Sequence, residues 1–184
     1  MRSDAQANRD RVLAAAEEVF GESGEAGSTE EVARRAGVGV GTVFRHFPTK
    51  QLLVEATIVR HLTVFTDTAR ARSESGEPGA AFRTTFREMV SDAPAKLALV
   101  ALLEGAGATD EVETAASALR DAVAVLLSRA QDAGAVRPDA TVDEVYVLIS
   151  ALSGARGDRA AVERAVDVVL DGLTPSRSGW PSPR

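Results

Sequence analysis

The sequence predicts an all-α protein. Apolar residues recur three or four positions apart along most of the 184-residue chain, and no segment alternates apolar and polar residues between hairpin turns. Glycine and proline fall between the helical segments, which indicates about nine helices in all. Hydrophobic residues make up 45% and charged residues 26% of the chain, as in folded globular proteins.

The first helix is predicted over residues 5–22. Its apolar side chains follow i, i+1, i+4, i+7 and i+8, which places them on one stripe. Gly21 and Gly24 help to end the helix. The stripe consists of Val12, Leu13, Ala16, Val19 and Phe20.

Two short helices around a tight turn are expected next. Ser28 lies three residues before a glutamate, the spacing of a capping box, and would start a helix that reaches residue 36. Gly37 would supply a positive φ in the turn. A further helix over residues 40–46 would end at Pro48, which removes a hydrogen-bond donor. This arrangement is typical of a helix-turn-helix.

The helix over residues 40–46 would present one face outward. Val38, Val43 and Phe47 are predicted to point inward, since the last two are one turn apart. Gly39 and Gly41 each cost a helix about 1 kcal/mol relative to alanine, which suggests close approach of a large partner. The outward residues are Val40, Gly41, Thr42, Phe44, Arg45 and His46.

Two helix starts could hold anions. A cation in the first turn, such as Lys50, opposes the helix dipole unless an anion docks there. Ser28 can cap its helix and also hydrogen-bond a phosphate. Thr49 can cap the helix that follows.

Longer helices are expected after this motif, over residues 50–72, 79–92, 94–106, 110–133, 141–156 and 158–173. The tail 174–184 is predicted to be disordered because it is rich in proline and serine. The helix over 50–72 would be a connector that packs on two neighbours through Leu52, Ala56, Val59, Ile58, Leu62 and Phe65.

Two apolar sets in these helices have open interpretations. One follows the spacing of a helix bundle and would either join two chains or fill the core of one: Val142, Val145, Ile149, Leu152, Val162, Val166, Val169 and Leu173. The other would line a ligand cavity or equally form plain core: Phe65, Phe82, Phe86, Met89, Leu97, Val100 and Leu103.

The charge distribution is uneven. The net charge is −6, yet residues 32–61 hold five cations and one anion, a local charge of +4. The remainder must carry −10, so a basic working surface would lie on an acidic body. A protein-interaction module without DNA binding would leave this concentration of cations unexplained.

Several classes of protein are not expected. Cysteine is absent, the N-terminus is polar, and no apolar run approaches the roughly 20 residues that cross a bilayer, so a cytoplasmic location is expected. The histidines, His46 and His61, lie in no catalytic motif, and metal-ligand spacing is missing. We therefore expect neither an enzyme nor a cofactor.

The DNA-binding region of the tetracycline-repressor (TetR) family closely resembles residues 28–53, STEEVARRAGVGVGTVFRHFPTKQLL. The match covers the A-x-x-A-G turn, G-x-G-T-V-F-x-H-F and P-T-K, and extends back through the first helix. The resemblance implies that residues 1–48 bind DNA and residues 49–173 form a regulatory and dimerisation domain. It implies a homodimer on a palindromic operator, because one recognition helix reads too few bases, and a small apolar or amphipathic effector that releases the DNA.

By this resemblance, several residues match positions that commonly contact operator DNA. Phe44 occupies a place usually held by tyrosine, so one hydroxyl donor to phosphate is lost. Thr29 stands where an apolar residue is common. The matching positions are Ser28, Thr42, Phe44, Arg45, His46 and Lys50, with Val40 and Gly41 as further candidates.

Overall fold

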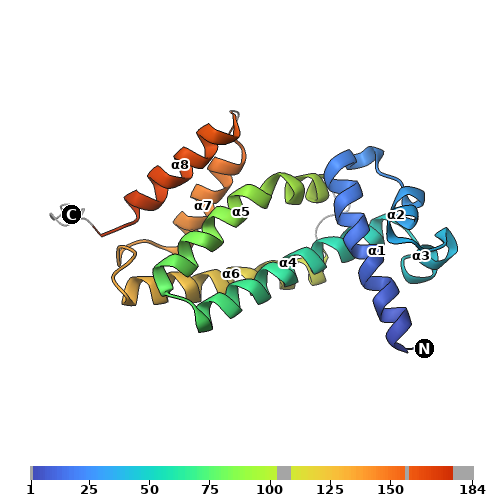
Figure 1. The fold of residues 1–184 in the computed structure, drawn as a ribbon, viewed down its shortest axis with the longest axis horizontal. Coiled ribbons are helices and arrows are strands. Elements are labelled where there is room, and N and C mark those ends of the chain that lie inside the picture. Colours follow the sequence, from blue (N-terminus) through green and yellow to red (C-terminus); the bar gives the residue numbers. More distant parts are fainter. Residues whose placement is uncertain (1, 103–108, 156–157, 176–184) are drawn as a thin grey trace. The chain divides into compact units, whose positions relative to one another are not determined.

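The computed structural model describes residues 2–102, 109–155 and 158–175, with backbone only for residues 2–4, 93–98 and 100. Every regular element in these ranges is a helix, which confirms the all-α fold (Figure 1). The elements are α1 (Arg2–Ser23), the 3₁₀ turn η1 (Gly24–Ala26), α2 (Thr29–Ala36), α3 (Val40–His46), α4 (Lys50–Ser75), α5 (Pro78–Ala101), α6 (Asp110–Asp132), α7 (Val142–Ser153) and α8 (Arg159–Gly172).

The chain forms two compact units. Unit 1 consists of Met1–Phe65 and Pro94–Ala118, and unit 2 consists of Thr66–Ala93 and Leu119–Arg184. Helices α4, α5 and α6 each contribute residues to both units. The predicted boundaries at 48/49 and 173/174, which divide the chain by function, stay predictions.

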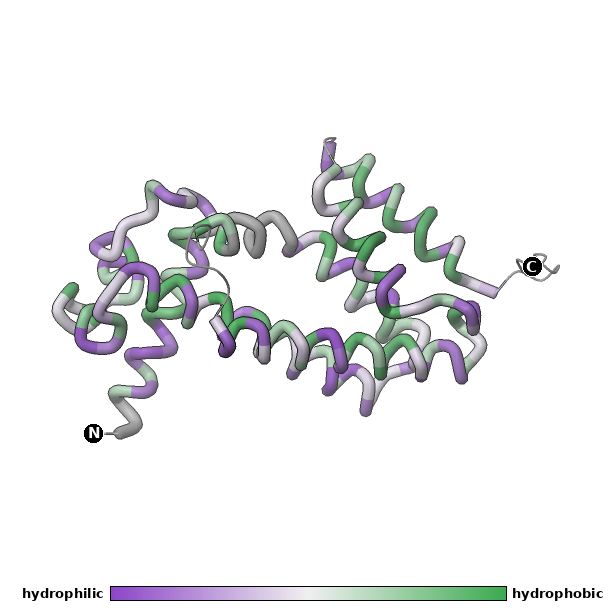
Figure 2. The backbone as a smooth tube through the Cα atoms, turned by 180° about the vertical axis from the view of Figure 1, so that it is seen from behind, coloured by the Kyte–Doolittle hydropathy of each residue, from purple (hydrophilic) through white to green (hydrophobic). Residues whose placement is uncertain are grey.

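The core of unit 1 contains the predicted stripe of α1, whose five members are at most 1% exposed. On α4 the prediction for Leu52 is wrong, because this side chain is 46% exposed. The buried stripe begins one residue later, at Leu53 and Val54, and returns one turn on at Ile58. In Figure 2 apolar and polar residues both recur along each helix, as expected of helices with one buried face.

Helix α5 differs from the sequence prediction. Separate helices were expected over 79–92 and 94–106, but one helix runs through Pro94 to Ala101. Proline removes one helical hydrogen bond without forcing the chain to turn. Pro78 instead marks the true start, where the carboxylate of Glu77 accepts the backbone N–H groups of Gly79 and Ala80 at 2.9 and 2.6 Å.

The described core of unit 2 is closely packed. Phe82 and Phe86 are each 2% exposed, and their ring centroids lie 6.3 Å apart. They pack with their neighbours so closely that a water molecule does not fit among them. The surrounding residues are Thr85, Met89, Val123, Leu126, Val145 and Ile149.

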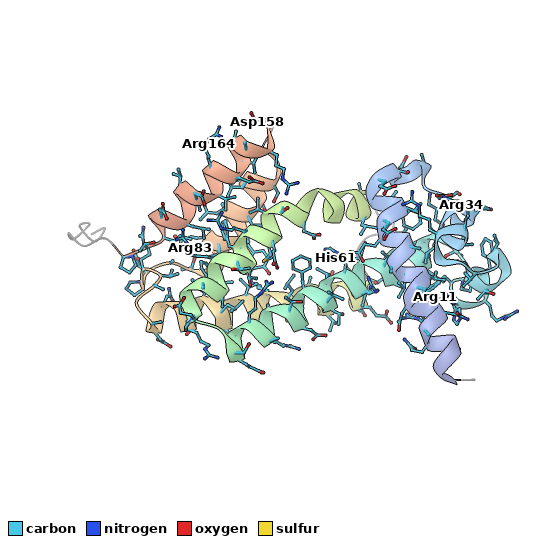
Figure 3. All side chains as sticks on the ribbon, in the orientation of Figure 1. Arg11, Arg34, His61, Arg83, Asp158 and Arg164 are labelled. Atoms are coloured by element: carbon cyan, nitrogen blue, oxygen red, sulfur yellow. The ribbon has the colours of Figure 1, made fainter. Side chains whose placement is uncertain are left out.

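Ion pairs connect the helices of unit 2 at its surface. Arg83, labelled in Figure 3, and Arg87 lie one turn apart on α5 and pair with Asp171 and Asp167 of α8. The two aspartates and Arg87 are exposed, so each pair contributes little stability. None of the helices that the structure describes has both the length and the apolar content needed to span a bilayer.

Candidate nucleic-acid interface

Short-range hydrogen bonds cap α2 at its start and form the turn between α2 and α3. Ser28 caps α2, since its Oγ accepts the N–H of Glu31 at 3.1 Å. Gly37 has φ +66° and ψ +36°, the left-handed conformation predicted for it. Its N–H donates to the Arg34 carbonyl at 3.2 Å, and the Val38 N–H donates to the Ala33 carbonyl at 3.0 Å. This pair of bonds is a Schellman motif, which ends α2 and starts the chain towards α3.

Helix α3 has one buried and one outward face. Val43 is fully buried and Phe47, directly after the helix, is 4% exposed, as predicted for the inward side. Gly41, Phe44 and Arg45 are exposed, with Phe44 at 44%. The other predicted readers, Val40, Thr42 and His46, are half-buried, as is the predicted inward residue Val38.

Carboxylates neutralise part of the predicted basic surface. Glu31 accepts hydrogen bonds from both Arg34 and Arg35, and Arg35 also reaches Glu22 at 2.7 Å. The pKa of Glu31 is lowered from 4.5 to about 2 by its hydrogen bonds from Arg34 and then Arg35. The local charge of +4 was counted over residues 32–61 and omits Glu31, so it overstates the free positive charge beside α3. Arg34 is labelled in Figure 3.

The start of α4 is tied to the turn after α1. The Lys50 ammonium donates to the backbone carbonyl of Glu25 at 2.8 Å and lies 5.4 Å from the centroid of the Phe20 ring. Thr49 caps α4 as predicted, because its Oγ1 accepts the Leu52 N–H at 3.1 Å. A phosphate contact by Lys50 stays a prediction; the ammonium has three N–H donors, so the bond to Glu25 leaves two for it.

Unit 1 also contains an open groove of about 540 Å³ between α1 and α4, a volume typical of small-molecule sites. Glu17 of α1 lies in its wall and accepts hydrogen bonds from Arg60 at 2.7 Å and from the buried His61 at 2.8 Å. The bond from His61 is the largest cause that lowers the pKa of Glu17 below 4.5. Phe65, from the predicted cavity set, also lines this groove. His61 is labelled in Figure 3.

The rest of the predicted cavity set is divided. Phe82, Phe86 and Met89 belong to the closed core of unit 2. Leu103 and the side chains of Leu97 and Val100 lie outside the described residues. A cavity lined by the complete set therefore stays a prediction.

The set predicted to join two chains also divides. Four members, Val145, Ile149, Val166 and Leu173, are at most 8% exposed within the single chain. The other four, Val142, Leu152, Val162 and Val169, are half-buried, and the role of the set in dimerisation stays a prediction. Sequence reasoning missed Val147 and Val168, which are 67% and 72% exposed on α7 and α8. Periodicity selects the inward stripe of a helix and gives no signal for one apolar residue on the outer face.

Two family models match the chain. Residues 12–57 match "Bacterial regulatory proteins, tetR family", and residues 77–175 match "Transcriptional regulator SbtR-like, C-terminal domain". HTH-type transcriptional regulators of Staphylococcus aureus are 41% identical over 66 residues, which is 35% of this chain and 36% of theirs. The chain thus spans about a third of the length of these curated relatives.

Solved structures match along almost the whole chain. The TetR transcription regulatory protein from Mycobacterium vanbaalenii is 39% identical with a TM-score of 0.81, and the match covers 95% of this chain and 99% of that one. A TetR transcriptional regulator from Streptomyces coelicolor is 33% identical with a TM-score of 0.80, covering 91% and 99%.

Proposed function

We propose that this chain, which belongs to the tetR family of bacterial regulatory proteins, is a ligand-responsive repressor that binds a palindromic operator as a homodimer. The family consists of transcription regulators and not of enzymes, and its DNA-binding part is the helix-turn-helix formed here by α2 and α3. Its site of action would be the cytoplasm, where bacterial DNA lies.

The observation that carries the proposal is the exposed face of α3. Arg45 is exposed there, and Thr42 lies one turn before it on a helix whose other side is anchored by the buried Val43. A guanidinium can bond two acceptors of a guanine in the major groove. We therefore assign Arg45 and Thr42 to base edges, and Ser28 and Lys50 to phosphates at the two flanking helix starts.

Selection of bound sites from random DNA tests the proposal, since an enriched palindrome would support both sequence readout and two-fold symmetry. Arg45→Ala should then lose about 1 to 3 kcal/mol at particular base pairs of that site. The matched control is Arg70→Ala, an exposed arginine of α4 within unit 2, which should leave the site preference unchanged. A uniform loss at all sequences would mean that Arg45 contacts the DNA backbone. If the selection enriched no site, operator binding would be refuted.

We propose that the two chains meet through α7 and α8. The exposed Val147 and Val168 support this assignment, because they leave apolar surface on the outer faces of these helices. Val147→Glu combined with Val168→Glu should shift the protein to monomers in sedimentation equilibrium. Val125→Glu on α6, at a valine 53% exposed, should not. Equal behaviour of the two variants would place the interface elsewhere.

The proposed effector would act through α4, which begins at Lys50 beside the helix-turn-helix and continues into unit 2. A displacement of its far end would therefore reach the recognition helix. Effectors typically change operator affinity by about 5- to 150-fold. If operator affinity is measured against a library of apolar and amphipathic compounds and none changes it, unit 2 is a dimerisation scaffold.

A further inference from the structure

An arginine outside the helix-turn-helix lies beside the end of the recognition helix. The guanidinium carbon of Arg9, on α1, is 5.3 Å from the centroid of the Phe47 ring. Phe47 directly follows α3 and is 4% exposed, so its ring is fixed in the core of unit 1. Arg9 itself is half-buried. A positive charge from the first helix is therefore held next to the element that reads DNA.

Four other cations of unit 1 are more fully engaged than Arg9. Arg34, Arg35 and Arg60 are paired with carboxylates. Lys50 donates to a backbone carbonyl. Within the residues that the structure describes, no carboxylate lies within ion-pair distance of Arg9, so its charge is available to an outside anion.

The contact with Phe47 leaves the hydrogen-bonding capacity of Arg9 intact. A guanidinium is planar, and its five N–H groups point outward in that plane, while an aromatic ring attracts its face. The cation–π contact therefore uses none of these donors. It also restricts a flexible side chain in advance, so less conformational entropy is lost when an anion binds.

We propose that Arg9 binds a backbone phosphate of operator DNA beside the recognition helix. The inference rests on the proposed function and adds a contact from α1 to those assigned to Ser28 and Lys50. Two oxygens of one phosphate match the fork of a guanidinium. The contact would help to set the angle of α3 in the major groove and would carry no base specificity. Sequence reasoning missed Arg9 because its link to Phe47 spans 38 positions and no local pattern reports it.

The test uses the full-length protein and the DNA site selected by the wild type. Arg9→Gln keeps most of the aliphatic stem and removes the charge. Its affinity should fall roughly tenfold at the selected site and to a similar extent on random DNA. The slope of log affinity against log salt should decrease by about one unit, as for one lost phosphate contact. Arg9→Lys keeps the charge and should preserve most of the slope.

The matched control is Arg11→Gln on the same helix, where the exposed guanidinium bonds to Asn8 (Figure 3). It should leave the slope unchanged. An unchanged slope in Arg9→Gln would overturn the inference even if affinity fell, because the arginine would then only brace α1 against Phe47. Equal slope changes in both variants would overturn it too, since any positive charge on α1 would then contribute equally to DNA binding. If the wild type showed no salt-dependent binding, the proposed function itself would fail.

Discussion

The helix-turn-helix and unit 2 are held together over different distances along the chain. In the helix-turn-helix the bonds that cap α2 and form the turn join residues three to five apart, such as Ser28 to Glu31 and Val38 to Ala33. In unit 2 the ion pair between Arg83 and Asp171 joins residues 88 positions apart. Local hydrogen bonds therefore shape the turn of the DNA-reading part, whereas contacts between distant residues hold the helices of the body together. Substitutions in the two regions should accordingly differ in size and in what they alter.

The largest effect is expected in the core of unit 2. Phe86→Ala should lower the free energy of unfolding by about 3 to 5 kcal/mol, because it opens a cavity in closely packed surroundings. Urea unfolding at one fixed protein concentration measures this loss. Val125→Ala at the surface of α6 is the control and should stay within about 0.5 kcal/mol. If both variants cost the same, the core is not packed solid and has room for an effector.

A smaller effect compares equivalent helix caps in the two regions. Ser28→Ala and Thr141→Ala should each cost about 1 kcal/mol, because each removes the side-chain acceptor at a helix N-terminus. Only Ser28→Ala should also weaken DNA binding if its hydroxyl meets a phosphate. Thermal unfolding gives the first quantity and operator titration the second. If the two variants bound the operator equally well, the role of Ser28 would be limited to capping α2.

These caps also show what the sequence could predict. The cap at Ser28, the turn at Gly37 and the inward Val43 and Phe47 depend on neighbours within one or two helical turns, and all were predicted correctly. Ser28 and Glu31 have the spacing of a capping box, but the Glu31 carboxylate accepts its hydrogen bonds from Arg34 and Arg35. The full capping box occurs at Thr141, whose N–H donates to the Glu144 carboxylate at 2.8 Å.

The body was harder to predict because helical periodicity does not identify the partner of an apolar face. The spacing of Val145 and Ile149 suits a bundle core or a dimer interface equally well, and the structure packs both against Phe82 and Phe86. Arg9 was missed for the same reason, since its aromatic partner is distant in the sequence.

The next effect, smaller and opposite in sign, concerns glycine. Gly41→Ala should stabilise the free protein by about 0.5 to 1 kcal/mol, because a Cβ there meets no atom within 4 Å and alanine favours helix. Gly172→Ala on α8 should do the same, for the same reason. If DNA approaches the backbone at Gly41, only the first variant should lose operator affinity. Unimpaired binding would contradict a close approach at this position.

The smallest effect is confined to acid pH. Because the folded-state pKa of Glu31 is lowered to about 2, its contribution to stability is complete above pH 4.5 and is lost as the pH falls through about 2. Carbon NMR titration should give a midpoint near that value, and Arg34→Gln should raise it towards 4.5. Glu77 in unit 2, whose pKa is lowered by the N–H groups of Gly79 and Ala80, should not change in this variant. No upward shift at Glu31 would mean that Arg34 is not its main partner.

Pro94 has a further consequence for how the molecule opens. It supplies no N–H to the carbonyl of Val90 four residues earlier, and it is also the residue at which α5 passes from unit 2 to unit 1. Cooperative opening events tend to follow compact units and not single helices. In hydrogen–deuterium exchange we expect the amides of α5 before Pro94 to lose protection together with unit 2, and those after it together with unit 1. One continuous helix would then contain two kinetic populations of amide protons.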